Sequence, residues 1–190
     1  DSNDIQIIDT YIEQHLVEWG LSESDVSGLI YTDFYQSRKS EIKHFYLRQA
    51  IDEIEIFNTN ANAHIKDDQI IRFKQNFLSD INQNYNQKTS NITAEDAIRL
   101  AAQHLGQEQT FDLQVKEIKN QNNRETIYQG GAYAYDDINA KLSFYPRKNN
   151  LFISWEIAIN DVVTNKWWQV FVDATSGNIL DKISWTVECS

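Results

Sequence analysis

Two amphipathic helical segments, each followed by a series of short alternating segments, constrain the fold of this 190-residue chain most strongly. The helical spacing of apolar residues covers residues 5–19 in the first half and residues 93–105 in the second. The connections between the alternating segments are too short for crossover helices, so we expect antiparallel pairing. The pattern predicts an α+β fold made of two consecutive helix-plus-antiparallel-sheet subdomains of cystatin-like form.

In the first half, the helical segment ends at Gly20, and its apolar stripe comprises Ile5, Ile8, Tyr11, Ile12, Leu16 and Trp19. Residues 21–73 then resemble a run of strands. The polar, Asn/Gln-rich stretch 79–90 is typical of a boundary. We therefore predict one subdomain over residues 1–80 and a second over residues 91–190.

Two strands of the first half have a clear two-residue period. In the segment 43–51, Phe45, Leu47 and Gln49 share one face. In the segment 54–65, simple alternation divides the side chains into two sets. One set is Ile54, Ile56, Asn58, Asn60, Asn62 and His64, and the other is Phe57, Thr59, Ala61, Ala63 and Ile65.

The second half begins with a well-capped helix. Thr93 is a good N-cap, Asp96 lies three residues later, and Gly106 is the expected stop. The predicted buried stripe comprises Ala97, Ile98, Ala101 and Leu105. Strand patterns follow in FDLQVKEI, AKLSFYP, NLFISWEIAIN and WWQVFVDA.

The segment WWQVFVDATSGNIL, residues 167–180, predicts a strand pair with a tight turn. Asp173 can accept hydrogen bonds from the backbone of its own turn, and Gly177 can adopt a positive φ. No group in the hairpin is suited to catalysis. We interpret it as a structural element that directs the C-terminal tail ISWTVECS.

Charge and composition exclude several classes of partner. The formal net charge of −11 disfavours nucleic acid and anionic membranes as partners. No apolar run approaches the ~18 residues that a membrane-spanning helix needs, so we expect no membrane insertion. The single cysteine, Cys189, excludes an internal disulfide and a cysteine-based zinc site.

No catalytic, metal or cofactor motif is found. None of the four histidines, His15, His44, His64 and His104, lies four residues from another, which excludes a His-Glu-x-x-His zinc site. The Gly130-Gly131 pair is isolated and forms no phosphate loop. We therefore expect a protein without enzymatic activity, cofactor or metal site of its own.

The stretch HFYLRQAIDEIEIFNTNANAHI, with LSESDV upstream, resembles the fungalysin/thermolysin propeptide (FTP) domain. The positions that match its pattern are Tyr46, Arg48, Gln49, Ile56, Phe57 and Asn58. The family usually has Gly in the following turn, where this chain has Asp52-Glu53, so we expect a longer turn or one of another type. The second half is similar to a PepSY domain, in its opening helix TAEDAIRLAAQHLG and its closing hairpin.

The resemblance implies the N-terminal pro-region of a secreted, fungalysin-like zinc metallopeptidase. Such a region assists folding of the catalytic domain and covers its cleft. On this basis, the expected partner-binding positions are Tyr46, Arg48, Gln49, Asn58, Trp185 and Cys189. A thiolate at Cys189 would be a candidate ligand in trans for the catalytic zinc. The implied location is secreted, periplasmic or cell-surface after signal removal.

Two other readings stay open. The chain could be a stand-alone PepSY-type inhibitor or binding module that acts in trans on another partner. It could also be a cystatin-like carrier of a small ligand or carbohydrate, for which the Trp167-Trp168 pair would be the best platform.

Overall fold

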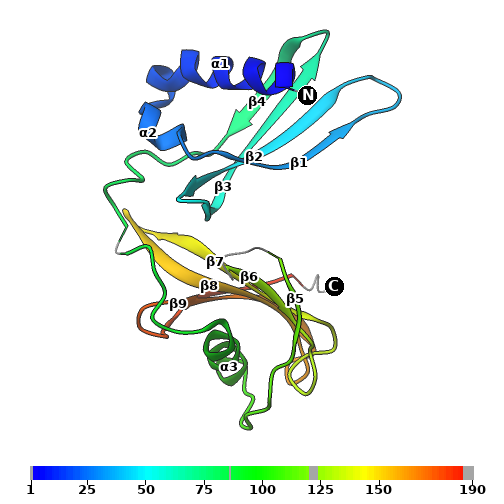
Figure 1. Ribbon diagram of the computed structural model, residues 1–190, viewed down its shortest axis with the longest axis vertical. Helices are drawn as coiled ribbons and strands as arrows, with labels where there is room; N and C mark the ends of the chain where they lie inside the picture. The colour runs from blue at the N-terminus through cyan, green and yellow to red at the C-terminus, as the bar shows by residue number, and fades with distance from the viewer. Residues whose placement is uncertain (1, 86, 120–123, 186–190) are drawn as a thin grey trace, which may run out of the picture. The chain divides into compact units, whose positions relative to one another are not determined.

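The structure is a computed structural model that describes residues 2–85, 87–119 and 124–185 (Figure 1). The chain divides into two compact units, unit 1 over residues 1–84 and unit 2 over residues 85–190. The division falls inside the Asn/Gln-rich stretch 79–90. Each unit packs a helix on antiparallel strands, so the predicted α+β fold class is confirmed.

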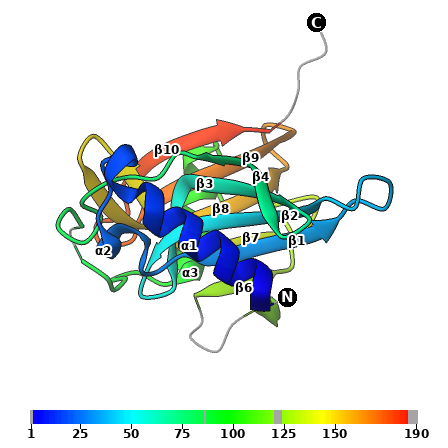
Figure 2. The ribbon, with the colours of Figure 1, turned by 90° about the horizontal axis from the view of Figure 1, so that it is seen from above.

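Unit 1 places two helices on a four-stranded antiparallel sheet of order β1-β2-β3-β4. Figure 2 shows α1 lying across the strands of this sheet. The elements are α1 (Ser2–Trp19), α2 (Glu23–Val26), β1 (Ile30–Gln36), β2 (Lys43–Ile51), β3 (Ile54–Lys66) and β4 (Gln69–Gln75). The run of strands predicted from residue 21 is therefore wrong at its start, where a capping box at Ser22 and Asp25 forms the short helix α2.

The core of unit 1 lies between α1 and the sheet. Its buried side chains are Ile8, Ile12, Leu16, Phe45, Leu47, Ala61, Ala63 and Ile65. The predicted helical stripe is confirmed except at Ile5, which is 37% exposed. The preceding residue, Asp4, is fully buried, and its carboxylate accepts a hydrogen bond from Lys43 Nζ at 2.8 Å.

Unit 2 forms six antiparallel strands in the order β5-β6-β7-β8-β9-β10. Its elements are α3 (Ala94–His104), β5 (Val115–Ile118), β6 (Glu125–Tyr128), β7 (Ile138–Arg147), β8 (Asn150–Asp161), β9 (Lys166–Asp173) and β10 (Ile179–Ser184). The strand β6 has no counterpart among the predicted segments, because its four residues are too few to show a period.

The helix α3 packs on β7, β8 and β9. Thr93 Oγ1 accepts from Asp96 N at 3.1 Å, and Asp96 accepts from Thr93 N in return. Ala97, Ile98 and Ala101 are fully buried, and Gly106 ends the helix with φ +104°. The predicted cap, stripe and stop of this helix are confirmed.

The β2–β3 and β3–β4 hairpins of unit 1 each turn through two acidic residues with positive φ. Asp52 and Glu53 have φ values of 49° and 65°, and Asp67 and Asp68 have 50° and 56°. Positive φ at both central positions of a two-residue loop is the type I′ conformation, which suits the twist of paired strands. A longer β2–β3 turn is therefore the wrong expectation, and each left-handed residue costs about 1–2 kcal/mol instead.

Within the described residues, no helix is both long enough and apolar enough to cross a lipid bilayer.

Candidate protein-binding surface

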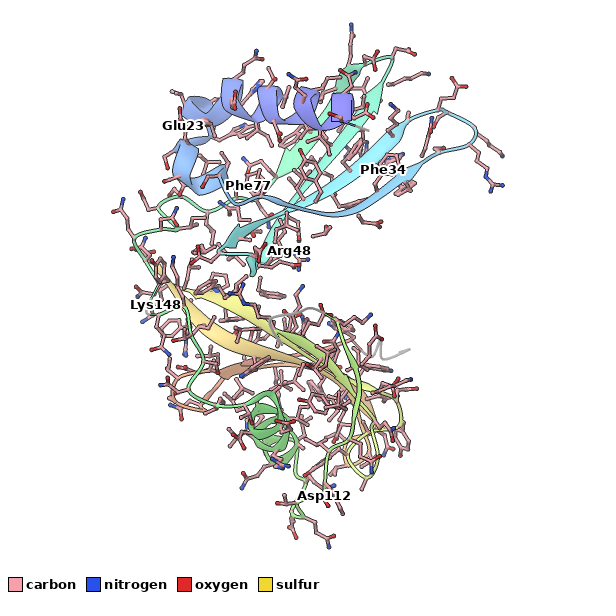
Figure 3. The ribbon with its side chains drawn as sticks, in the orientation of Figure 1. Glu23, Phe34, Arg48, Phe77, Asp112 and Lys148 are labelled. Carbon is pink, nitrogen blue, oxygen red and sulfur yellow. The ribbon has the colours of Figure 1, made fainter. Side chains whose placement is uncertain are left out.

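The expected partner-binding residues of unit 1 separate into two groups with different surroundings. Tyr46 and Arg48 lie on the face of the sheet that α1 does not cover, and Figure 3 shows Arg48 directed to that side. Gln49 lies on the other face and Asn58 lies in an irregular part of β3. Tyr46 and Arg48 are half-buried and accessible to a partner, Gln49 is buried, and Asn58 has an exposed side chain and a backbone carbonyl in a structural contact.

Gln49 is a buried connector inside unit 1. Its side chain is 0% exposed, and Nε2 donates to Asp25 O at 2.9 Å and to Leu78 O at 2.8 Å. Its Oε1 accepts from Leu78 N at 2.7 Å. These bonds attach α2 and the segment after β4 to the sheet. The Gln49 side chain is therefore not accessible to a partner.

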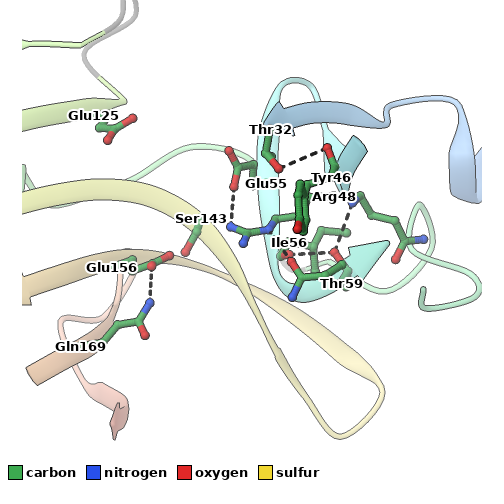
Figure 4. A network of polar contacts seen from close by, with 12 residues as sticks. Thr32, Tyr46, Arg48, Glu55, Ile56, Thr59, Glu125, Ser143, Glu156 and Gln169 are labelled. Carbon is green, nitrogen blue, oxygen red and sulfur yellow. Dashed lines mark hydrogen bonds and ion pairs between the residues drawn. The ribbon is translucent and has the colours of Figure 1, made fainter. Parts of the chain in front are cut away.

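Asn58 forms a β-bulge. Its φ is 60°, and the register with β2 shifts between Arg48 and Ala50. Thr59 Oγ1 stabilises the bulge by donating to Ile56 O at 2.8 Å (Figure 4). Asn76 Nδ2 donates to Asn58 O at 2.6 Å. The backbone of Asn58 thus forms the bulge and accepts a hydrogen bond that holds it in place.

The bulge also overturns the simple alternation predicted for β3. Ile54 and Ile56 are buried on the same side as Thr59, Ala61, Ala63 and Ile65, and not on the side of Asn60, Asn62 and His64. Between the pairs Arg48–Asn60 and Ala50–Glu55, β3 advances five residues while β2 advances two. An odd number of extra residues shifts the two-residue period by one position, so every side chain beyond the bulge changes face.

The uncovered face of the sheet has a consistent polar and aromatic composition. We call it the helix-free face of unit 1. Following the strand register, it comprises Asp33 and Tyr35 from β1, His44, Tyr46 and Arg48 from β2, Asn60, Asn62 and His64 from β3, and Arg72 and Lys74 from β4.

A hollow of about 370 Å³ lies in this face, lined by residues of β1, β2 and β3, including Tyr46, Arg48 and Asn62. Arg48 Nε donates to Asn60 Oδ1 at 3.1 Å, and Nη1 donates to Glu55 at 2.6 Å (Figure 4). The Oδ1 atom of Asn62 is buried and has no hydrogen-bond partner among the described residues. A buried acceptor without a partner is unfavourable, so a donor from a bound molecule would stabilise it.

A row of rings crosses the face beside this hollow. The rings of Tyr35 and His44 stack at 4.3 Å, and those of His44 and His64 meet edge to face at 4.5 Å. Burial lowers the pKa of His64, and the nearby His44 and Arg72 lower it further. The charged form of the His64 ring is therefore disfavoured.

Charge is distributed unevenly between the two sides of unit 1. The helices α1 and α2 contain no Lys or Arg and carry Asp4, Asp9, Glu13, Glu18, Glu23 and Asp25. The helix-free face carries Arg48, Arg72 and Lys74 against the carboxylate of Asp33 and that of Glu55, which is paired with Arg48. A chain with a net charge of −11 thus has a locally cationic face.

In unit 2, the hairpin after β9 is organised by Asp173. Its Oδ1 accepts from Thr175 N at 2.8 Å and from Thr175 Oγ1 at 2.6 Å. Burial raises the pKa of Asp173, but the hydrogen bonds from Thr175 and Ser176 outweigh it and hold the pKa below its usual value. Gly177 has φ +77°, and a Cβ there would approach Leu100 to 3.1 Å.

The remaining expected residues lie at the end of the chain. Trp185 is 56% exposed, and its N–H donates to Trp167 O at 3.0 Å. Cys189 lies outside the described residues. Across residues 2–85, 87–119 and 124–185, no group of three or more His, Cys, Asp or Glu side chains could hold a metal ion.

Comparison with known proteins identifies few similar proteins. No family model matches the chain, and no curated protein matches it. Among solved structures, it is similar to the Bacillus megaterium YpeB C-terminal domain, with a TM-score of 0.39 and 11% sequence identity. The similarity covers 98% of this chain and 65% of that one, so the chain spans less than two thirds of its neighbour's length.

Proposed function

We propose that this chain is a non-catalytic pro-region that binds the catalytic domain of a secreted zinc metallopeptidase. In this role it assists folding of the peptidase and covers its cleft until processing. The observation that carries the proposal is the helix-free face of unit 1. There, Tyr46 and Arg48, which belong to the FTP-like pattern, line a hollow that is open to a partner.

The required affinity is modest while the two domains are covalently joined. A tether supplies an effective concentration on the order of millimolar. A surface with an intrinsic Kd of ~1 μM would then keep the cleft about 99.9% covered. After cleavage, retention at nanomolar protein would need a Kd of ~1 nM, which is about 4 kcal/mol more favourable. Cleavage followed by dilution therefore releases the active enzyme without any change in the surface.

The proposal is tested by adding purified 1–190 to the catalytic domain of a fungalysin-like zinc peptidase and following casein hydrolysis. We expect inhibition that saturates at one chain per enzyme. Excess casein should not relieve this inhibition at once, even when it is present during preincubation. Trypsin serves as the control enzyme, because an effect on trypsin as well would show that the chain acts only as a competing substrate.

Two outcomes contradict the proposal. Unchanged hydrolysis, together with no heat of binding by calorimetry, would remove the peptidase as the partner. Binding without inhibition would remove the inhibitory role and favour a stand-alone module that acts on another partner in trans.

A further inference from the structure

The cations of the helix-free face are arranged along one strand with the period of an extended chain. Arg72 and Lys74 are two residues apart in β4, so they point to the same side, about 7 Å apart at their Cα atoms. An extended peptide repeats its own side chains at this spacing. Carboxylates at every second position of such a peptide therefore match the two cations.

Both cations are available to an external carboxylate. Arg72 and Lys74 are exposed, and neither forms an ion pair with any residue in the described parts of the chain. Arg48, which lies on the same face, is already paired with Glu55. The unpaired charge of the face is thus concentrated on β4.

Next to these cations, β3 offers groups that bind a peptide backbone. Asn62 lies opposite Lys74 and has the buried Oδ1 without a partner, and Asn60 lies two residues before it. Amide side chains both donate and accept, so they can pair with the N–H and C=O groups of an extended segment. The tyrosines Tyr35 and Tyr46 add apolar contact area on the same face.

The acidic side of unit 1 does not cancel this attraction. The carboxylates of α1 are separated from the helix-free face by the helix and sheet layers, a distance on the order of 10 Å. At an ionic strength of ~0.1 M the Debye length is about 10 Å, so interactions across the unit are largely screened. Local cations therefore decide which charge is attracted at the face.

We propose that the helix-free face of unit 1 binds an extended acidic segment of a partner protein. Arg72 and Lys74 pair with carboxylates at alternate positions, and the hollow beside Tyr46 and Arg48 receives the backbone next to them. Cations on an edge strand also discourage sheet-to-sheet association, but that protective role requires neither the amides nor the hollow. The inference adds the partner's chemistry to the proposed function and does not require the partner to be a peptidase.

The test measures fluorescence anisotropy of a labelled twelve-residue peptide of alternating Thr and Glu, with full-length 1–190 at an ionic strength of ~0.1 M. The comparison ligands are the same peptide with Gln in place of Glu, and the oligonucleotide dT12. Two charge-matched variants are used, R72Q/K74Q on the face and R38Q/K39Q in the exposed β1–β2 turn. Thermal melting verifies that both variants are folded.

We expect the Glu peptide to bind about tenfold more tightly than the Gln peptide. R72Q/K74Q should weaken this binding about tenfold, and R38Q/K39Q less than about twofold. An equal loss in both variants would show that only net charge matters and would overturn the proposal. Failure to bind the Glu peptide would overturn it too. Tighter binding of dT12, lost in R72Q/K74Q, would replace the acidic protein segment with nucleic acid.

Because the peptide is tested without any peptidase, its result is separable from that of the inhibition assay. Peptide binding with no inhibition would uphold the acidic partner and reject the peptidase. Inhibition with no peptide binding would uphold the peptidase and reject this face as a site for acidic segments.

Discussion

The helical layers of both units pack apolar side chains on their sheets, and unit 1 adds buried polar contacts to this packing. In unit 1, the apolar residues Ile8, Ile12 and Leu16 of α1 pack on the sheet. Buried polar contacts are added to this packing, since Asp4 is paired with Lys43 and Gln49 bonds to Asp25 and Leu78. In unit 2, α3 is attached by the apolar side chains Ala97, Ile98 and Ala101, all 0% exposed. A buried polar group that loses its partner lowers the free energy of unfolding, and its hydrogen bonds require a specific geometry. Apolar contacts tolerate small shifts.

This difference predicts the largest effect for a polar deletion in unit 1. Gln49→Ala should lower the free energy of unfolding by about 3–4 kcal/mol, because three backbone groups lose a buried partner. Urea denaturation followed by far-UV circular dichroism measures it. The control is Gln14→Ala at an exposed position of α1. A loss below about 1 kcal/mol would show that water replaces these bonds and would erase the contrast between the units.

In unit 2, the corresponding deletion removes apolar packing. Ile98→Ala should cost about 3 kcal/mol, the usual range for a buried Ile→Ala change. Gln103→Ala on the exposed side of the same helix is the control for helix propensity. Equal stability of the two variants in urea would mean that the α3 contacts are loose.

The residue pattern predicted unit 2 more completely than unit 1, because the buried polar contacts of unit 1 cannot be read from local sequence. A helix with a Thr93 cap and an Ala-rich stripe is specified by local chemistry and apolar periodicity, and both are visible in sequence. The burial of Asp4 and Gln49 depends on partners far along the chain, Lys43 and Leu78, which no local pattern reveals.

The candidate surface was predictable only in part. Tyr46, Arg48, Gln49 and Asn58 were all expected to face a partner, but the resemblance could not separate the other three from Gln49, whose side chain the fold buries. The contribution of Arg72 and Lys74 depends on strand register. It becomes visible only when β4 is placed beside β3.

The turns of the two units are stabilised in different ways, and the dependence of stability on pH should reveal the difference. In unit 2, the pKa of Asp173 lies below its unfolded value, so its stabilising contribution is present above that value and is lost as the pH falls through the folded pKa. Wild-type stability should therefore exceed that of Asp173→Asn by about 1 kcal/mol at pH 6, and the gap should be smaller at pH 3.

Urea denaturation at both pH values checks this, with Asp80→Asn in an exposed loop as the control. A gap that stays constant from pH 6 to pH 3 would show that the charge of Asp173 contributes nothing to the hairpin.

The β2–β3 turn of unit 1 holds Glu53 at φ 65°. Glu53→Gly should raise the free energy of unfolding by up to about 1 kcal/mol, because glycine has no steric penalty in the left-handed region. The matched change Glu108→Gly, in an exposed loop at negative φ, should not stabilise. Destabilisation by Glu53→Gly would mean that its side chain has a role other than the turn.

The central claim is that the chain acts by binding a peptidase through the helix-free face of unit 1. Its most direct test compares the inhibition constants of wild-type 1–190, R72Q/K74Q and R38Q/K39Q against the same zinc peptidase. We predict at least a roughly tenfold weaker inhibition for R72Q/K74Q and a change within about twofold for R38Q/K39Q. Equal inhibition by all three proteins, or none by any, would contradict the claim.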